Sequence, residues 1–278
     1  AMEQLEGQVA SAKIGMARLA SPQLYWVLSG NDFTLDINNP TEPKIVCMGN
    51  NPEKQGIYGA VLSLYIARLI KIVNKKGKIP CGLDFDEFPT IYFNNMDSLI
   101  ATARSNKVAT TLAMQDFSQL RKDYGKEQAD VITNICGNII SGQVTGDTAK
   151  MLSDRFGKII QERESISINR TDTSISKSKQ LESAIPASKI SSLSSGEFVG
   201  MVADNPDEKI KLKMFHAEVI NDSDLMNEEM AKFKNIPIVA QVTSQQVSDN
   251  FFQVKYDIKQ LIEKEVDILI QKKEMMSQ

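Results

Sequence analysis

Two adjacent carboxylates, Asp86 and Glu87, are the residues of this chain best suited to chemistry. They stand at the end of a short, mostly apolar run that begins at Ile79, and Phe88-Pro89 follows them at once. A buried strand that ends in Asp-Glu is how many nucleoside triphosphatases hold magnesium and activate water. We therefore expect Asp86 to bind the water shell of Mg²⁺ and Glu87 to polarise the attacking water. The signal is weak alone, because many buried strands end in a turn-forming acid.

Gln115 and Arg104 add two further candidate groups. Gln115 follows the apolar segment 108–114, which we predict to be the neighbouring strand, and a glutamine there can bind a γ-phosphate or the attacking water. Arg104 lies at the end of a helix predicted over 96–105, where an arginine can reach a neighbouring subunit and neutralise transition-state charge. The alternative for Arg104 is an arginine that offsets the dipole of its own helix, which is common.

The loop that cradles the phosphates in such enzymes is absent from these 278 residues. Nothing in the sequence reads G-x-x-x-x-G-K-[ST], and Thr145-Gly146-Asp147-Thr148 lacks the lysine. The carboxylates therefore look like half of a nucleotide site. The opening Ala1-Met2 resembles a cloning remnant, so we expect the chain to be part of a longer protein.

The elements that must position these residues alternate between strand and helix. The predicted strands are 44–48, the run ending at Glu87, 108–114 and 138–142, and the predicted helices are 58–73, 96–105, 116–135 with a break at Tyr124-Gly125, and 145–156. This alternation predicts a mostly parallel sheet covered by helices. Because parallel strands end on one edge of a sheet, Asp86, Glu87 and Gln115 should meet there.

The pattern changes on either side of this α/β core, which we place at residues 43–160. Residues 1–42 form a segment that leads into the core and include a helix over 3–20. Residues 161–278 hold an added β-hairpin and a long helix that we expect to pack on the core. The pattern there predicts a strand over 158–169, a solvated Ser-rich loop over 170–195, a hairpin of 198–203 with 209–219 around Asn205-Pro206-Asp207, and a helix over 247–275. The last helix has an apolar face that suits either packing or assembly.

Composition excludes several classes of protein. A net charge of −3 gives no global basic field to attract nucleic acid. Cys47, Cys81 and Cys136 have no CxxC spacing, which favours reduced core thiols. The single histidine, His216, falls in a strand pattern, where a plain strand position is favoured over catalysis. We find no apolar stretch long enough to cross a bilayer and no signal peptide.

The ordered set of motifs closely resembles the TraG/TraD family of type IV secretion coupling proteins. These are membrane-anchored, hexameric, RecA-like ATPases of bacterial conjugation. The resemblance spans roughly residues 20 to 220 and rests on residues 83–89, Ala103-Arg104-Ser105, residues 113–120, Asp123-Tyr124-Gly125, Ile132-Thr133-Asn134 and residues 185–197. It implies a RecA-like fold and identifies the chain as the C-terminal part of the motor domain.

The resemblance also implies roles for the four candidate residues. Asp86 would hold magnesium, Glu87 would be the catalytic carboxylate, Gln115 the phosphate sensor and Arg104 the arginine finger of a neighbouring subunit. The intact protein would bind ATP and Mg²⁺, whereas we expect neither on this chain, nor appreciable ATPase activity, because the phosphate loop is missing.

The partners implied by the family are single-stranded DNA with its attached relaxase and the type IV secretion channel proteins. The intact protein would be a homohexamer at the cytoplasmic face of the bacterial inner membrane. The membrane anchor is missing from this chain, which we expect to be a soluble monomer.

Two other hypotheses stay open. One is a HerA-like translocase of double-stranded DNA that shares the RecA-like core, although Tyr124-Gly125 and Gln119-Leu120 favour the coupling protein. The other is a RecA-like module that binds partners without hydrolysis, in which Asp86 and Glu87 are a structural remnant.

Overall fold

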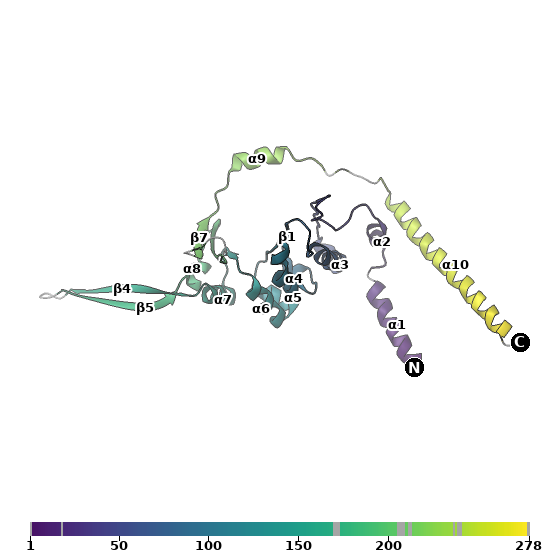
Figure 1. Cartoon of the computed structure of the whole chain (residues 1–278), viewed down its shortest axis with the longest axis horizontal. Coiled ribbons are helices and arrows are strands. Elements are labelled where there is room, and N and C mark those ends of the chain that lie inside the picture. Colours follow the sequence, from purple (N-terminus) through teal and green to yellow (C-terminus); the bar gives the residue numbers. More distant parts are fainter. Residues whose placement is uncertain are drawn as a thin grey trace. The chain divides into compact units, whose positions relative to one another are not determined.

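A computed structural model describes residues 2–17, 19–168, 173–204, 209–210, 213–235, 237 and 241–276 (Figure 1). The chain divides into two compact units. One comprises residues 1–35, 50–61 and 232–278, and the other comprises residues 36–49 and 62–231. All four candidate site residues lie in the second unit. The functional boundaries expected at residues 42 and 160 stay a prediction.

A parallel pair of strands carries the candidate site, as predicted. Strand β1 (Cys81–Phe85) pairs with β2 (Val108–Leu112) in a register that runs from Cys81↔Val108 to Phe85↔Leu112. The helices that follow the strands are α4 (Met96–Ala103), the 3-10 turn η3 (Arg104–Asn106), α5 (Phe117–Tyr124) and α6 (Lys126–Ile135). The predicted break between the last two helices is confirmed at Gly125, whose φ of 78° lies in the region that favours glycine. Each of these three α-helices buries apolar side chains.

A second, antiparallel sheet contains β3 (Ile139–Ser141), β6 (Glu197–Met201) and β7 (Met214–Glu218), in the order β3-β6-β7. The prediction that residues 138–142 extend the parallel sheet was wrong, because β3 pairs antiparallel with β6, beginning at Ile139↔Met201. The partner strand lies some sixty residues further along the chain, so local periodicity could not reveal the pairing. The predicted hairpin of β6 and β7 is confirmed, and His216 lies within β7. The predicted turn Asn205-Pro206-Asp207 lies outside the described residues.

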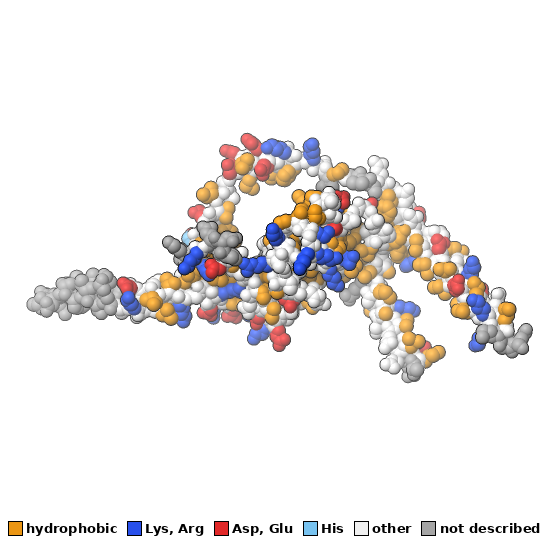
Figure 2. All heavy atoms as spheres, in the orientation of Figure 1, with side chains coloured by type: hydrophobic (Ala, Val, Ile, Leu, Met, Phe, Trp, Pro, Cys, Tyr) orange, Lys and Arg blue, Asp and Glu red, His pale blue; other side chains and the backbone are white. Residues whose placement is uncertain are grey.

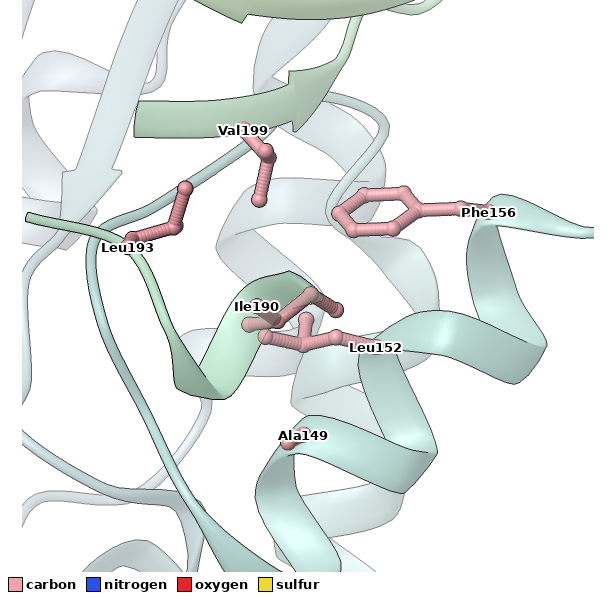
Figure 3. Packing of buried hydrophobic residues seen from close by; sticks show 6 residues of the cluster. All are labelled: Ala149, Leu152, Phe156, Ile190, Leu193 and Val199. Carbon is pink, nitrogen blue, oxygen red and sulfur yellow. The ribbon is translucent and has the colours of Figure 1, made fainter. Parts of the chain in front are cut away.

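The helices α7 (Gly146–Phe156) and α8 (Ala187–Ser191) pack beneath this second sheet. Their buried side chains form one cluster, here called the α7 core (Figure 3), which consists of Ala149, Leu152, Phe156, Ile190, Leu193 and Val199. Burial of this apolar area is the main term that holds the second sheet to its helices.

A long hairpin separates α7 from α8. It consists of β4 (Lys158–Ile168) and β5 (Thr173–Ser183), which pair from Lys158↔Ser183 to Ile168↔Thr173 (Figure 1). The strand over 158–169 is therefore confirmed to residue 168. The solvated loop expected over 170–195 was wrong, because β5 and α8 fall within it. A Ser- and Lys-rich composition resembles a loop, yet cross-strand pairing satisfies the backbone regardless of side-chain polarity. Residues 169–172 lie outside the described part.

Two other predictions need correction. Residues 44–48 form no strand, because an apolar run without a partner strand cannot satisfy its backbone in a ladder. They are not a buried run either, since Ile45 is 95% exposed. Cys47 is also exposed and is not a core thiol, whereas Cys81 and Cys136 are partly buried. Helix α3 (Gln55–Val73) confirms the helix predicted over 58–73, but it is long and apolar enough, by length and composition, to cross a membrane. About a third of that span is buried, including Val73.

The first unit contains α1 (Met2–Ala17), α2 (Pro22–Ser29), η1 (Pro52–Lys54) and α10 (Ser244–Met276). The second unit also contains η2 (Phe88–Thr90) and α9 (Ser223–Ala231). Both terminal helices agree with the sequence patterns, and residues 24–28 are helical. The rings of Tyr25 and Phe251 lie 5.8 Å apart and join α2 to α10. Further along α10, Leu261 and Leu269 are exposed. Hydrophobic side chains lie along this helix in Figure 2.

Candidate nucleotide-hydrolysis site

The chain turns sharply where β1 ends, and the turn presents both carboxylates at the carboxyl edge of the parallel pair. Glu87 has φ 50° and ψ 45°, a left-handed conformation that costs a non-glycine residue about 1 kcal/mol or more. Backbone hydrogen bonds on both sides fix the turn: Ala113 N–H donates to Phe85 O and Phe88 N–H donates to Ala113 O, both at 2.9 Å. The Thr90 hydroxyl also donates to Glu87 O at 2.8 Å.

Aromatic packing holds this turn against α5. Phe88 is 1% exposed, and its ring stacks on that of Tyr124 with the centroids 5.0 Å apart. The Tyr124 hydroxyl donates to Ile91 O at 2.6 Å, and burial raises the pKa of Tyr124. The Tyr-Gly element of the sequence therefore anchors the segment that follows the carboxylates.

Gln115 contacts Glu87 directly. Its Nε2 donates to Oε1 of Glu87 at 2.8 Å across 28 residues of sequence. Glu87 is partly buried, whereas Gln115 and Asp86 are exposed. The parallel register of β1 and β2 thus brings together three of the four predicted residues, as their positions at strand ends led us to expect.

Asp86 has room to bind a hydrated cation. Its Oδ1 accepts the backbone N–H of Glu87 at 3.0 Å, and the residue is exposed. Within that described part no group of three or more His, Cys, Asp or Glu could hold a metal ion. Mg²⁺ commonly takes one or two carboxylates and completes its shell with water and substrate phosphates, so a single exposed carboxylate fits this ion.

Arg104 lies apart from these three residues. It begins η3, just before β2, whereas Gln115 follows the other end of that strand. Five strand residues separate the two ends by about 13 Å. The exposed Arg104 borders an open pocket of about 360 Å³ together with Ile100, Lys107, Val108, Ala109 and Thr110. The arginine is therefore placed to act on something other than the Glu87 of its own chain.

Asp116 is a site residue that the sequence patterns did not single out. It caps α5, because its Oδ1 accepts the Ser118 N–H at 2.7 Å, and its Oδ2 accepts the Thr148 hydroxyl at 2.8 Å. Although partial burial raises the pKa of Asp116, the hydrogen bonds from Ser118 and Thr148 together hold it below its ordinary value. An aspartate just before a helical segment was the available signal.

Solved structures with the same architecture define the class of fold. The plasmid coupling protein TrwB bound to a GTP analogue matches with a TM-score of 0.60 and 12% identity over 77% of this chain and 49% of that chain. TrwB bound to ADP and Mg²⁺ matches with a TM-score of 0.58 and 14% identity over 78% of this chain and 49% of that chain. The fold is therefore the RecA-like α/β fold that the sequence predicts, and the chain spans about half the length of these proteins.

The family follows from the sequence of the central segment. Residues 80–195 match the family described as "TraM recognition site of TraD and TraG". This segment is therefore similar to the TraG/TraD family, and the predicted resemblance is confirmed over it. A comparison with curated proteins finds no match.

Proposed function

We propose that this chain is part of the motor of a conjugation coupling protein, which hydrolyses ATP to move relaxase-bound single-stranded DNA to a type IV secretion channel. The observation that carries the proposal is the Gln115–Glu87 hydrogen bond beside Asp86, at the edge of a parallel strand pair. Family membership of residues 80–195 and the RecA-like fold support it.

The residues of this edge divide the work between them. Asp86 would hold the water shell of Mg²⁺, which would offset the charge on the phosphates when bound. Glu87 would orient the attacking water and accept its proton, and the fixed turn keeps that carboxylate in one place. Gln115 would exchange its bond to Glu87 for one to the γ-phosphate or the water and so report the state of the nucleotide.

The remaining parts of the active centre would come from outside this chain. A phosphate loop with its lysine is needed to hold the β- and γ-phosphates, and the present sequence has none. Arg104 would serve the active centre of the neighbouring subunit, a role supported by its position at the far end of β2. Both requirements favour a ring, and we propose a homohexamer for the intact protein.

The proposed setting follows from the same family. TrwB has been solved with a non-hydrolysable ATP analogue and with ADP and Mg²⁺, so we propose ATP and Mg²⁺ as the ligands of the intact protein. Its partners would be the relaxase on single-stranded DNA and the secretion channel, at the cytoplasmic face of the inner membrane.

A transfer assay tests the proposal. Donor cells carrying the complete protein with Glu87→Gln should lose transfer of relaxase-bound DNA, whereas Glu127→Gln, on the first turn of α6, should transfer normally. Unchanged transfer by the Glu87 variant would contradict a hydrolytic motor and favour the partner-binding module. Transport of duplex DNA without a relaxase would favour the HerA-like translocase.

A further inference from the structure

Three consecutive residues at the end of β2 contact three different parts of the second unit. Gln115 donates to Glu87 at 2.8 Å, and Asp116 accepts from Thr148 of α7 at 2.8 Å. Phe117 packs against the α7 core, whose residues Figure 3 shows. A displacement of this segment at the carboxylate edge must therefore act on α7 as well.

Helix α7 is also joined to the parallel-strand region along its length. Nη2 of Arg121, on α5, lies 3.7 Å from Sδ of Met151. At the other end of α7, the guanidinium of Arg155 donates to the carbonyl oxygens of Thr133 and Cys136, which closes the C-terminus of α6. The Asp116–Thr148 bond is the contact nearest the candidate site, and Thr148 is only 7% exposed.

The far end of α7 holds the base of the hairpin β4–β5. Ser153, which is 5% exposed, donates its hydroxyl to Ile185 O at 2.8 Å just beyond β5. Ala184 N–H donates to Gly157 O at 2.9 Å and closes the two strands at their base. Because Ser153 lies near the end of α7 and Gly157 directly follows the helix, a shift of α7 carries the hairpin base with it.

We propose that Asp116 is a positioning residue that transmits the state of the candidate site to α7 and to the base of the β4–β5 hairpin. The inference rests on the proposed function, since a nucleotide must draw Gln115 away from Glu87. When Gln115 moves, the adjoining Asp116 shifts its bond to Thr148, and α7 follows. The coupling is reciprocal, so a partner that moves the hairpin changes the hold of Gln115 on Glu87.

A mutant cycle read by amide hydrogen exchange on this chain, without nucleotide, tests the coupling. Gln115→Leu breaks the bond to Glu87 and should change exchange in α7 and at Ala184 by about two-fold or more, the lower end of coupling between contacting residues. In a Thr148→Val background the change should disappear, and with Thr148→Ser, which restores the hydroxyl, it should return. Thr133→Val is the matched control, because among the described residues the Thr133 hydroxyl bonds only within α6, to Ala129 O.

Two results would overturn the inference: no response of α7 to Gln115→Leu, or the same response with and without the Thr148 hydroxyl. Either result would make Asp116 a helix cap alone. Neither would affect the proposed function, which depends on hydrolysis by Glu87. Conversely, a complete protein that hydrolyses ATP without Glu87 would refute the function while leaving the cycle intact.

Discussion

Nε2 of Gln115 lies 2.8 Å from Oε1 of Glu87, although 28 residues separate them in sequence. The parallel register places both residues just beyond their strand ends, and the left-handed turn at Glu87 aims its carboxylate at the amide. Each side chain satisfies a hydrogen-bonding group of the other. Under the proposed function the pair would also have a second arrangement, with Gln115 bonded to a nucleotide, as a sensor requires.

The strained turn predicts a conflict between stability and function. Glu87→Gly should have a free energy of unfolding about 1 kcal/mol higher than Glu87→Ala, because both variants lose the bond to Gln115 but only glycine adopts a left-handed conformation without steric cost. Urea denaturation measures the difference, and the same pair of substitutions at Asp86, which has no positive φ, is the control, since there glycine should be the less stable. Equal stability of the two Glu87 variants would show that the turn stores no strain.

Tyr124 should matter through its hydroxyl as well as its ring. Tyr124→Phe removes the bond to Ile91 O and should lower the free energy of unfolding by about 1 kcal/mol, since it leaves a carbonyl without its donor. Tyr92→Phe removes an exposed hydroxyl that donates to Oδ1 of Asn94, two residues along the chain, and should change stability little. Thermal or urea unfolding of both variants measures the difference, and equal effects would refute an anchoring role for Tyr124.

The lowered pKa of Asp116 predicts a specific pH dependence. The folded state stabilises its ionised carboxylate. The resulting contribution to the free energy of unfolding is fully present above the ordinary aspartate pKa of about 3.9, and it is lost as the pH falls through the lower pKa of the folded state. The difference in unfolding free energy between wild type and Asp116→Asn should therefore be constant near neutrality and shrink on acidification. Urea titrations between neutral pH and about pH 3 measure it, and a pH-independent difference would contradict the assignment.

Arg104 should act across a subunit boundary. In the complete protein, Arg104→Ala and Glu87→Gln should each abolish ATP hydrolysis, because an arginine finger contributes about 10³-fold or more. Rings mixed from the two variants should regain part of the activity, since some interfaces pair an intact Glu87 with an intact Arg104. The measurement is hydrolysis as a function of the mixing ratio; mixtures as inactive as their parents would contradict a role in trans.

The part of the fold that carries the site could be predicted because its signals are local. The strands ending near Glu87 and Gln115, and the helix break at Gly125, follow from apolar periodicity and glycine. The partner of β3 could not be predicted, because the pairing requires a close approach between residues far apart in sequence. Gly200 allows this approach, since a Cβ there would collide with Ile139 O and the Phe215 ring. The role of Asp116 was equally hidden, since its second partner, Thr148, lies 32 residues away on α7.

We propose Glu87 as the catalytic carboxylate of an ATPase whose phosphate loop is not among these residues. Its most direct test is steady-state ATP hydrolysis by the complete protein, its Glu87→Gln variant and the present chain alone. We predict that the complete protein hydrolyses ATP and that the present chain alone does not. The variant should lose about 10²-fold or more, since a positioned acid–base group contributes that much. Hydrolysis that survives Glu87→Gln, or Glu87-dependent hydrolysis by the present chain alone, would refute the catalytic role of Glu87 or the need for a phosphate loop.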